Sequence, residues 1–382
     1  MASKAYCNSG GVLLKEFLEK EALICAQCHY CRVCPVYSVI GWESVSPRGR
    51  MFMLRSILKG KLEPSIVVED FYKCTTCGAC EVVCQTSIPL VDVWETARAD
   101  FVRKGFAPLN IHKMLREIAE KTGSPYKEKR EDRGKWAEKY KTKEKAEIIY
   151  FAGCTASYRT KELAENTVEF FTKVGIDFCY AGADEVCCGS PFLRTGQREI
   201  VYEFFKKNYS EWKRRGVKTI VTTCAGCYRT ISRDYPKIAE ELGYEWDFKV
   251  FHTVQIIHKL LKEGKIKLKE WREKITYHDP CHLGRHMGIY EEPREVLKAL
   301  STDFVEMERN RENALCCGAG GGVRSQFKEI AMEIGKKRIE EAKRTGAKYI
   351  ISCCPFCKLH LEQSSEGSME VLDIIEVVNK KL

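Results

Sequence analysis

The sequence contains no run of about 20 apolar residues, which is the length that a helix needs to cross a bilayer. Even the stretch from Thr219 to Thr223 breaks off after a few residues. The segment from Met1 to Gly10 also lacks a basic stretch followed by an apolar one, which would mark an export signal. We therefore expect a cytoplasmic protein with no membrane-spanning segment, free or peripheral on the cytoplasmic face of the membrane, and without structural disulfides.

Recognisable motifs for nucleotides and nucleic acids are absent too. The glycine run from Gly318 to Gly322 follows Cys317 and not a strand, so it does not meet the dinucleotide-binding motif. The formal net charge of +10 counts every cysteine as neutral, whereas a cysteine that ligates a metal is a thiolate. We therefore expect neither a flavin site nor nucleic-acid binding.

Cysteine, in contrast, is abundant. The 382 residues include 21 cysteines, most of them in blocks at 25–34, 74–84, 154–227 and 281–357. Because structural disulfides are not expected, these blocks indicate metal sites. Three cysteines stand outside the pattern described below, and we interpret Cys7 as a tail thiol and Cys179 and Cys353 as small buried residues.

The intervals between the blocks suggest the domain plan. Helical apolar spacing in Leu13 to Leu23, Met51 to Leu58 and Val91 to Val102 predicts a mostly helical unit over residues 1–126. Residues 127–146 are almost all charged, which predicts a solvated linker or exposed helix at a domain boundary.

The rest of the chain is an internal repeat, with copies at 147–262 and 263–382. In each copy a short β-branched run leads to a cysteine, a Cys-Cys-Gly triplet follows, and a second run leads to a Cys-x2-Cys pair. Alternation with amphipathic stretches predicts parallel strands joined by helices. We therefore expect two tandem α/β domains with their cysteines on loops that leave strand ends.

The two N-terminal blocks carry ferredoxin-type motifs. Cys74-x2-Cys77-x2-Cys80-x3-Cys84 has the bacterial spacing, in which the fourth cysteine ligates the other cluster. Cys25-x2-Cys28-x2-Cys31-x2-Cys34 is one residue shorter before its last cysteine. If the crossed rule holds, one 4Fe-4S cluster takes Cys25, Cys28, Cys31 and Cys84, and the other takes Cys74, Cys77, Cys80 and Cys34. A pair of four-cysteine zinc sites is the alternative.

Each copy of the repeat supplies five cysteines. The first set is Cys154, Cys187, Cys188, Cys224 and Cys227, and the second is Cys281, Cys316, Cys317, Cys354 and Cys357. Five thiolates exceed what one tetrahedral zinc ion uses, and adjacent cysteines suit two irons of a cluster better than one ion. The alternative is that one of the two sets holds a zinc ion with a purely structural role.

The doubled Cys…Cys-Cys-Gly…Cys-x2-Cys pattern behind two ferredoxin motifs resembles the cysteine-rich CCG proteins. Residues 20–382 are similar to the D-subunit family of heterodisulfide reductases, whose setting is archaeal methanogenesis. The resemblance implies a helical dicluster ferredoxin domain with two cubane 4Fe-4S clusters. It also implies a noncubane 4Fe-4S cluster in each CCG domain, with both five-cysteine sets catalytic and the coenzyme M–coenzyme B disulfide cleaved between them.

Some residues near the cysteines are further candidates for the site, on weaker sequence evidence. His278 and His282 flank Cys281, and we select His282 as a candidate proton donor to a departing thiolate, with packing or hydrogen bonding to a ligand as the alternative. Arg285 and Arg324 are candidates to hold a sulfonate or phosphate, with solvated surface arginine as the alternative.

Electrons must come from another subunit. In the D-subunit family the donor is a membrane cytochrome b, and a soluble hydrogenase or flavoprotein is equally compatible with the sequence. The alternative function is a non-catalytic iron–sulfur electron-transfer subunit of a glycerol 3-phosphate, lactate or glycolate dehydrogenase complex. Some members of that wider group have lost cysteines from one CCG set, so the ten cysteines kept here favour catalysis.

Overall fold

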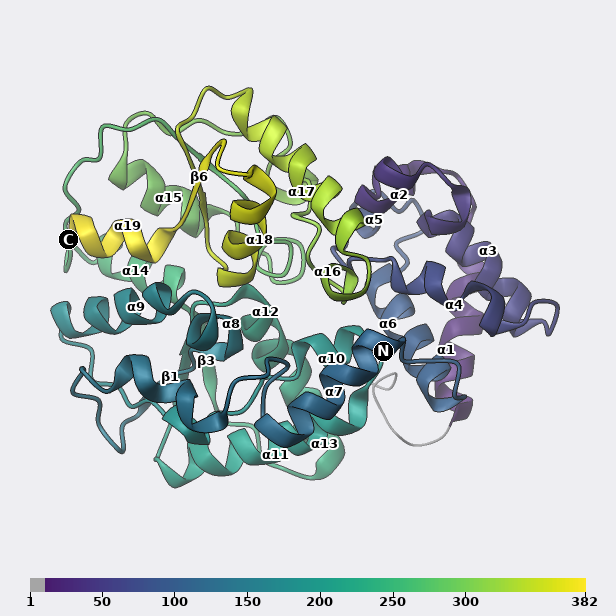
Figure 1. Cartoon of the computed structure of the whole chain (residues 1–382), viewed down its shortest axis with the longest axis horizontal. Coiled ribbons are helices and arrows are strands. Elements are labelled where there is room, and N and C mark those ends of the chain that lie inside the picture. The colour runs from purple at the N-terminus through teal and green to yellow at the C-terminus, as the bar shows by residue number, and fades with distance from the viewer. Residues whose placement is uncertain (1–10) are drawn as a thin grey trace.

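The computed structural model describes residues 11–382, and Cys7 lies outside this range. A helical N-terminal unit stands beside two α/β units, one formed by each copy of the repeat (Figure 1). The predicted fold class, a helical dicluster domain followed by two tandem α/β CCG domains, is confirmed.

The N-terminal unit consists of short helices around a small aromatic core. Pro35, Pro47 and Pro64 begin three of them, as expected for a residue whose missing N–H is not needed in the first helical turn. Phe71 packs edge-on against Trp94 and Phe101, with ring centroids 6.0 and 5.1 Å apart. The elements are α1 (Gly11–Ile24), η2 (Tyr30–Val33), α2 (Pro35–Ile40), η3 (Glu43–Val45), α3 (Pro47–Leu58), α4 (Pro64–Tyr72), α5 (Ala79–Val82), α6 (Leu90–Arg103) and α7 (Asn110–Thr122).

The first CCG unit is built on a parallel sheet of order β1-β2-β3. Its strands are β1 (Ile148–Tyr150), β2 (Thr219–Thr222) and β3 (Lys249–His252). The helices are α8 (Gly153–Tyr158), α9 (Lys161–Lys173), α10 (Ser190–Arg194), α11 (Arg198–Arg214), α12 (Ala225–Arg229), α13 (Tyr235–Leu242) and α14 (Thr253–Lys262), with single turns η5 (Gly182–Asp184) and η6 (Thr230–Asp234).

The second CCG unit repeats this plan with a parallel sheet of order β4-β5-β6. Both final helices begin with a capping box, from His252 and Gln255 in the first unit and from Asp373 and Glu376 in the second. The elements are β4 (Ile275–Tyr277), α15 (Glu291–Leu300), η7 (Arg311–Asn313), α16 (Val323–Gln326), α17 (Lys328–Lys343), β5 (Tyr349–Ser352), α18 (Pro355–Ser365), β6 (Glu370–Asp373) and α19 (Ile374–Lys381).

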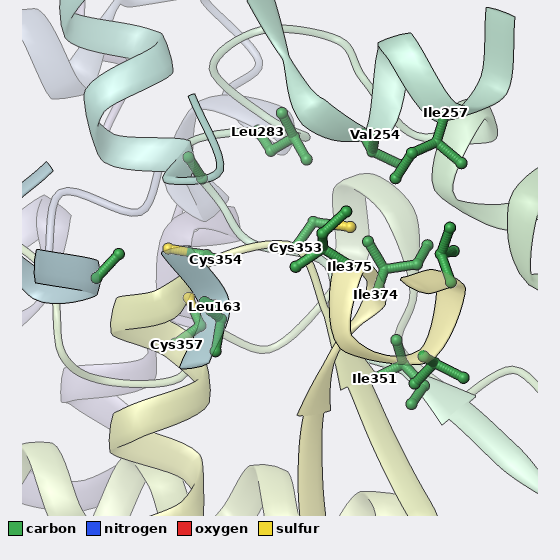
Figure 2. Packing of buried hydrophobic residues seen from close by; sticks show 14 of the residues in the cluster. Leu163, Val254, Ile257, Leu283, Ile351, Cys353, Cys354, Cys357, Ile374 and Ile375 are labelled. Atoms are coloured by element: carbon green, nitrogen blue, oxygen red, sulfur yellow. The ribbon is translucent and has the colours of Figure 1, made fainter. Parts of the chain in front are cut away.

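The two CCG units pack together through equivalent elements. Helix α9 packs on α19, and its counterpart α15 packs on α14, which is the pattern of a two-fold, self-complementary interface. Figure 2 shows Leu163, Val254 and Ile257 of the first unit gathered with Leu283 and Ile374 of the second in one buried cluster. This packing turns the cysteine-bearing ends of the two sheets toward each other.

A single buried arginine joins all three units. Arg98, on α6, donates to the backbone oxygens of Phe71 and Cys74 at 2.7 Å within the helical unit. It also donates to the Arg194 oxygen at 2.6 Å and to the Gly321 oxygen at 2.9 Å, in the first and second CCG units. The three units therefore meet at one charged, fully buried side chain.

The segment predicted as a solvated linker, residues 127–146, is partly built into the first CCG unit. It contains the turn η4 (Arg130–Ala137), in which Arg133, Trp136 and Ala137 are buried. Trp136 packs on Tyr180 with ring centroids 4.9 Å apart. Most other charged side chains of the segment face solvent, which is why the composition alone suggested a linker.

Between Gly11 and Leu382, no helix is both long enough and apolar enough to cross a membrane.

Candidate functional site

The eight ferredoxin-type cysteines form two separate groups in the structure. Cys25, Cys28, Cys31 and Cys84 line one small cavity of about 30 Å³. Cys34, Cys74, Cys77 and Cys80 line another of about 10 Å³. The last cysteine of each motif thus faces the first three of the other motif, which is the grouping that the crossed pattern requires.

The two ferredoxin-type groups differ in exposure. Cys28 is exposed and its three partners are intermediate, whereas all four members of the second group are buried. Burial raises the pKa of Cys34 to about 11, and the nearby Arg50 opposes this shift. Both Nη atoms of Arg50 are buried and find no partner among the described residues, so an anionic group in the second cavity fits them.

The Cys-Cys-Gly triplets follow from local geometry. Gly189 and Gly318 have φ of +84° and +99°, a region that side chains disfavour. A Cβ at Gly189 would lie 2.6 Å from a Val201 methyl group, and one at Gly318 would lie 2.5 Å from the Ala331 oxygen. Each glycine N–H points to the sulfur of the first cysteine of its triplet at 3.4 Å. Glycine therefore lets the backbone turn back and donate to a sulfur.

The five cysteines of each set converge at the carboxyl end of their sheet. Cys224 and Cys354 lie two residues past the ends of β2 and β5 and occupy the N-cap positions of α12 and α18. The Sγ atoms of Cys188 and Cys227 are 3.3 Å apart, and those of the equivalent Cys317 and Cys357 are 3.6 Å apart. Figure 2 shows Cys354 and Cys357 at the start of α18, beside Leu163 of the first unit.

One cavity of about 480 Å³ separates the two five-cysteine sets. Nine of the ten cysteines line it, all but Cys316. The neighbouring Cys224 thiol is the main reason that the pKa of Cys354 lies well below its usual value, so the two sets approach each other at these two residues. Arg324, Lys328, Ser190, Tyr126 and Phe356 complete much of the wall.

The second ferredoxin-type group adjoins the second CCG set. The neighbouring Cys316 thiol is the main reason that the pKa of Cys77 is lowered. Arg285 fixes this junction by donating to the Cys77 oxygen at 2.7 Å and to the Ala314 oxygen at 2.7 Å. Arg285 is thus engaged with backbone oxygens and is not in the cavity wall, whereas Arg324 is.

The histidines beside Cys281 occupy different places. His282 is in the cavity wall, and its ring lies tilted by 36° against the ring of His286, with centroids 4.5 Å apart. Burial, and then Arg229, lower the pKa of His282 to about 4, so the ring is neutral near pH 7. His278 lies behind the second set, where one of its ring nitrogens is within 4.8 Å of the sulfurs of Cys317 and Cys357.

Arg133 is a site residue that sequence reasoning missed. Its Nη atoms lie 3.5 and 3.6 Å from the Cys154 sulfur, and it pairs with Glu185 at 2.6 Å. Glu185 also accepts from the backbone N–H groups of Ala152 and Gly153. Arg133 belongs to the charged segment outside the repeat, so neither motif nor spacing signals it.

The donor sets fit iron–sulfur clusters. Each of the four groups offers four or five sulfurs, most of them buried in every group except the one that includes Cys28. Arg50 and Arg133 can offset the negative charge of a thiolate-bound cluster. Five convergent sulfurs exceed the four ligands of a structural zinc ion.

Comparison with known proteins agrees with this geometry. The family model "Cysteine-rich domain" (CCG) matches residues 148–232 and 275–362, and "4Fe-4S dicluster domain" matches residues 21–88. A crystal structure of a hypothetical protein from Helicobacter pylori shares the fold, with a TM-score of 0.60 and 10% identity over 98% of this chain and 73% of that one.

Three relatives show how the family extends. The D subunit of dihydromethanophenazine:CoB–CoM heterodisulfide reductase from Methanosarcina mazei is 37% identical over 94% of this chain and 93% of its own length. The B subunit of fumarate reductase (CoM/CoB) from Methanothermobacter marburgensis is 34% identical, over 93% and 71%. EtfAB:quinone oxidoreductase of Syntrophomonas wolfei is 30% identical, over 82% and 47%. The chain therefore belongs to the family of CCG-domain proteins typified by the heterodisulfide reductase D subunit and is an iron–sulfur subunit of a heterodisulfide reductase-type oxidoreductase.

Proposed function

We propose that this chain is the catalytic subunit of a heterodisulfide reductase and that it cleaves a mixed disulfide such as that of coenzyme M and coenzyme B. The observation that carries the proposal is the single cavity of about 480 Å³ bounded by both five-cysteine sets. The reaction joins one disulfide, two electrons and two protons to give two thiols. A disulfide in this cavity has a thiolate set on either side, so each sulfur can receive one electron.

We propose cubane 4Fe-4S clusters at the two ferredoxin-type groups and noncubane 4Fe-4S clusters at the two five-cysteine sets. Clusters held there supply one-electron redox chemistry. The chain contributes the thiolates, and it excludes water, since all but two of the ten CCG cysteines are buried.

The arrangement of thiolates supports one order of electron transfer. Electrons enter at the group that includes the exposed Cys28 and pass to the buried group that includes Cys77. From Cys77 they reach the neighbouring Cys316 of the second set, and the approach of Cys354 to Cys224 leads on to the first set. The second set is thus proposed to be reduced before the first.

The electron donor is proposed to be a partner protein that docks on the helical unit. Among the described residues, the large apolar side chains with high exposure all lie between Leu23 and Met114 and include Tyr30, Trp42 and Val82. A membrane cytochrome b and a soluble flavoprotein or hydrogenase are both compatible donors. Such a partner would place this chain in the cytoplasm or on the cytoplasmic face of the membrane.

Two kinds of side chain in the cavity wall suit the substrate. Arg324 and Lys328 are cationic, and Arg324 is held by Gln363 at 2.8 Å, so they can take an anionic end of the disulfide. The Nε2 atom of His282 is buried without a partner among residues 14–382, and because the ring is neutral near pH 7 it can stabilise a departing thiolate by an N–H hydrogen bond, with the proton coming from solvent.

The test is anaerobic EPR spectroscopy of the reconstituted full chain, poised oxidising, with coenzyme M thiol added. A paramagnetic signal that appears only with thiol and is lost in Cys188→Ala or Cys317→Ala would place the substrate at a CCG set. Cys353→Ser is the matched control, because Cys353 is buried next to the second set and belongs to no group.

An electron-transfer subunit without disulfide chemistry is the second candidate. It is favoured by the relative named EtfAB:quinone oxidoreductase, whose name mentions no disulfide. Silence on adding thiol, with cubane signals intact after reduction, would support this function and contradict the reductase.

A further inference from the structure

The two CCG sites differ at the residue that follows the first strand of each sheet. Phe151 follows β1 and donates its N–H to the Val221 oxygen at 2.8 Å. His278 follows β4 and donates its N–H to the Ile351 oxygen, also at 2.8 Å. Both side chains are completely buried. Equivalent backbone positions thus carry an apolar ring in the first unit and an imidazole in the second.

The imidazole of His278 is held in one protonation form by an arginine. The Nε atom of Arg338, on α17, donates to Nδ1 of His278 at 3.1 Å. A guanidinium has only donors, so Nδ1 must be the accepting nitrogen and the ring proton lies on Nε2. Arg338 is itself fixed by Glu341 at 3.0 Å and by the Arg309 oxygen at 2.9 Å.

The arginine is also specific to the second unit. The matching sequences Lys-Lys-Asn-Tyr-Ser-Glu at 206–211 and Lys-Lys-Arg-Ile-Glu-Glu at 336–341 align Asn208 with Arg338. The side chain of Asn208 accepts a hydrogen bond from the Val186 N–H and donates one to the Tyr235 hydroxyl. Histidine and its arginine are therefore present together in one unit and absent together from the other.

The Nε2 atom of His278 is the ring nitrogen that Arg338 leaves free. It is buried and has no hydrogen-bond partner among the described residues. A ring nitrogen of His278 lies within 4.8 Å of the sulfurs of both Cys317 and Cys357. A buried N–H without a protein partner costs free energy unless an acceptor is present, and thiolate or cluster sulfur is the acceptor available there.

We propose that His278, with its proton fixed on Nε2 by Arg338, donates a hydrogen bond to sulfur of the second five-cysteine set and raises the reduction potential of the cluster held there. A donor stabilises the added negative charge of the reduced state more than the oxidised state, and the effect is strong at a buried site. The inference rests on the proposed binding of a cluster at this set. His278 is a positioning residue that makes the second set a better electron acceptor for the Cys77 group.

The test is a potentiometric titration of the anaerobic, reconstituted full chain, followed by EPR without any disulfide. His278→Phe, the residue of the first copy, should lower the potential of the second set by at least a tenfold shift in the one-electron equilibrium, about 59 mV. His278→Gln keeps an N–H donor and should recover at least half of that shift. Phe151→Leu is the matched control at the first site and should leave the potential of the second set unchanged.

Two further measurements keep the test decisive. The double variant His278→Phe with Arg338→Asn installs the pair that the first unit already packs, and it should show the same shift if the single variant folds poorly. An unchanged potential in a variant with full iron content, or an equal shift in His278→Gln and His278→Phe, would overturn the inference. Zinc in place of iron at the second set would overturn both this inference and the proposed cofactor, whereas a missing thiol-dependent signal with the potential shift intact would contradict only the disulfide chemistry.

Discussion

The two CCG units share strand order, strand register and the spacing pattern of their cysteines, yet the groups around those cysteines differ. In the first unit Arg133, from outside the repeat, approaches Cys154. In the second unit His278 and Arg338 stand behind Cys317, and Cys77 of the helical unit lies near Cys316. Duplication has kept the scaffold while each set acquired different neighbours, so the two sets are expected to do different parts of one reaction.

The largest expected effect comes from removing one cysteine from either five-cysteine set, and it should show which set receives electrons first. Both Cys188→Ala and Cys317→Ala should lower disulfide reduction at least about 100-fold, since each removes a direct ligand and even outer-shell residues cost 10–100-fold. The two variants should differ in how fast each set is reduced by a one-electron donor, as followed by rapid-freeze EPR. Cys188→Ala should leave reduction of the second set intact, whereas Cys317→Ala should also slow reduction of the first set.

The opposite result, with the first set reduced at the normal rate in Cys317→Ala, would contradict the proposed order. Cys179→Ser provides a control for the loss of a buried thiol in the first unit, because Cys179 is fully buried and lines none of the three cysteine cavities.

The next largest effect concerns the buried ion pairs of the two units. Arg133→Gln leaves Glu185, 1% exposed, without its cation, and removal of one partner from a buried pair costs about 3–5 kcal/mol. Arg338→Gln should cost less, because Glu341 keeps Arg309 at 3.2 Å. In thermal unfolding of the anaerobic protein, the unfolding midpoint of Arg133→Gln should therefore be lower than that of Arg338→Gln.

An exposed ion pair provides the control for these two buried pairs. Arg130 and Asp184 lie 3.6 Å apart with both side chains well exposed, so Arg130→Gln should change stability by about 0–1 kcal/mol. Equal destabilisation by Arg130→Gln and Arg133→Gln would mean that η4 is a loose linker in solution, as its composition suggests.

A smaller effect is expected at the glycines of the two triplets. A side chain at such a φ costs about 1–3 kcal/mol. Gly318→Ala adds a clash with the backbone oxygen of Ala331, whereas Gly189→Ala meets a Val201 methyl group that can shift. Gly367→Ala shares the positive φ of +78° but has open space around it.

Unfolding midpoints should accordingly fall most for Gly318→Ala, less for Gly189→Ala and least for Gly367→Ala. A reversed order of Gly318 and Gly189 would show that the backbone of α17 yields more easily than the packing of α11. Iron content measured beside each midpoint separates a loss of fold from a loss of cluster.

Much of the fold and the grouping of cysteines could be predicted from the sequence. Apolar spacing identified the helical unit, and internal similarity identified two sheets, because both depend on residues near each other in the chain. The approach of Cys77 to Cys316 and the burial of Arg133 depend on how separate units pack, and local patterns carry no such information. His278 was singled out for its place near Cys281, but its partner Arg338 lies 60 residues away in the chain, so its orientation could not be inferred.

The smallest expected effect compares the capping residues of the two final helices. Asp373 accepts from the Ile375 N–H through Oδ1 at 3.1 Å, and His252 accepts from the Val254 N–H through Nδ1 at 3.3 Å. Asp373→Ala should destabilise the protein by about 1 kcal/mol and Asp373→Asn by only a few tenths, because asparagine caps equally well. Since His252 also bonds the Thr223 oxygen through Nε2, next to Cys224, His252→Ala should both destabilise the first unit and disturb its cysteine set, whereas Asp373→Ala should leave iron content unchanged. Equal iron loss in both variants would mean that the cap of α19 supports the second set as directly as His252 supports the first.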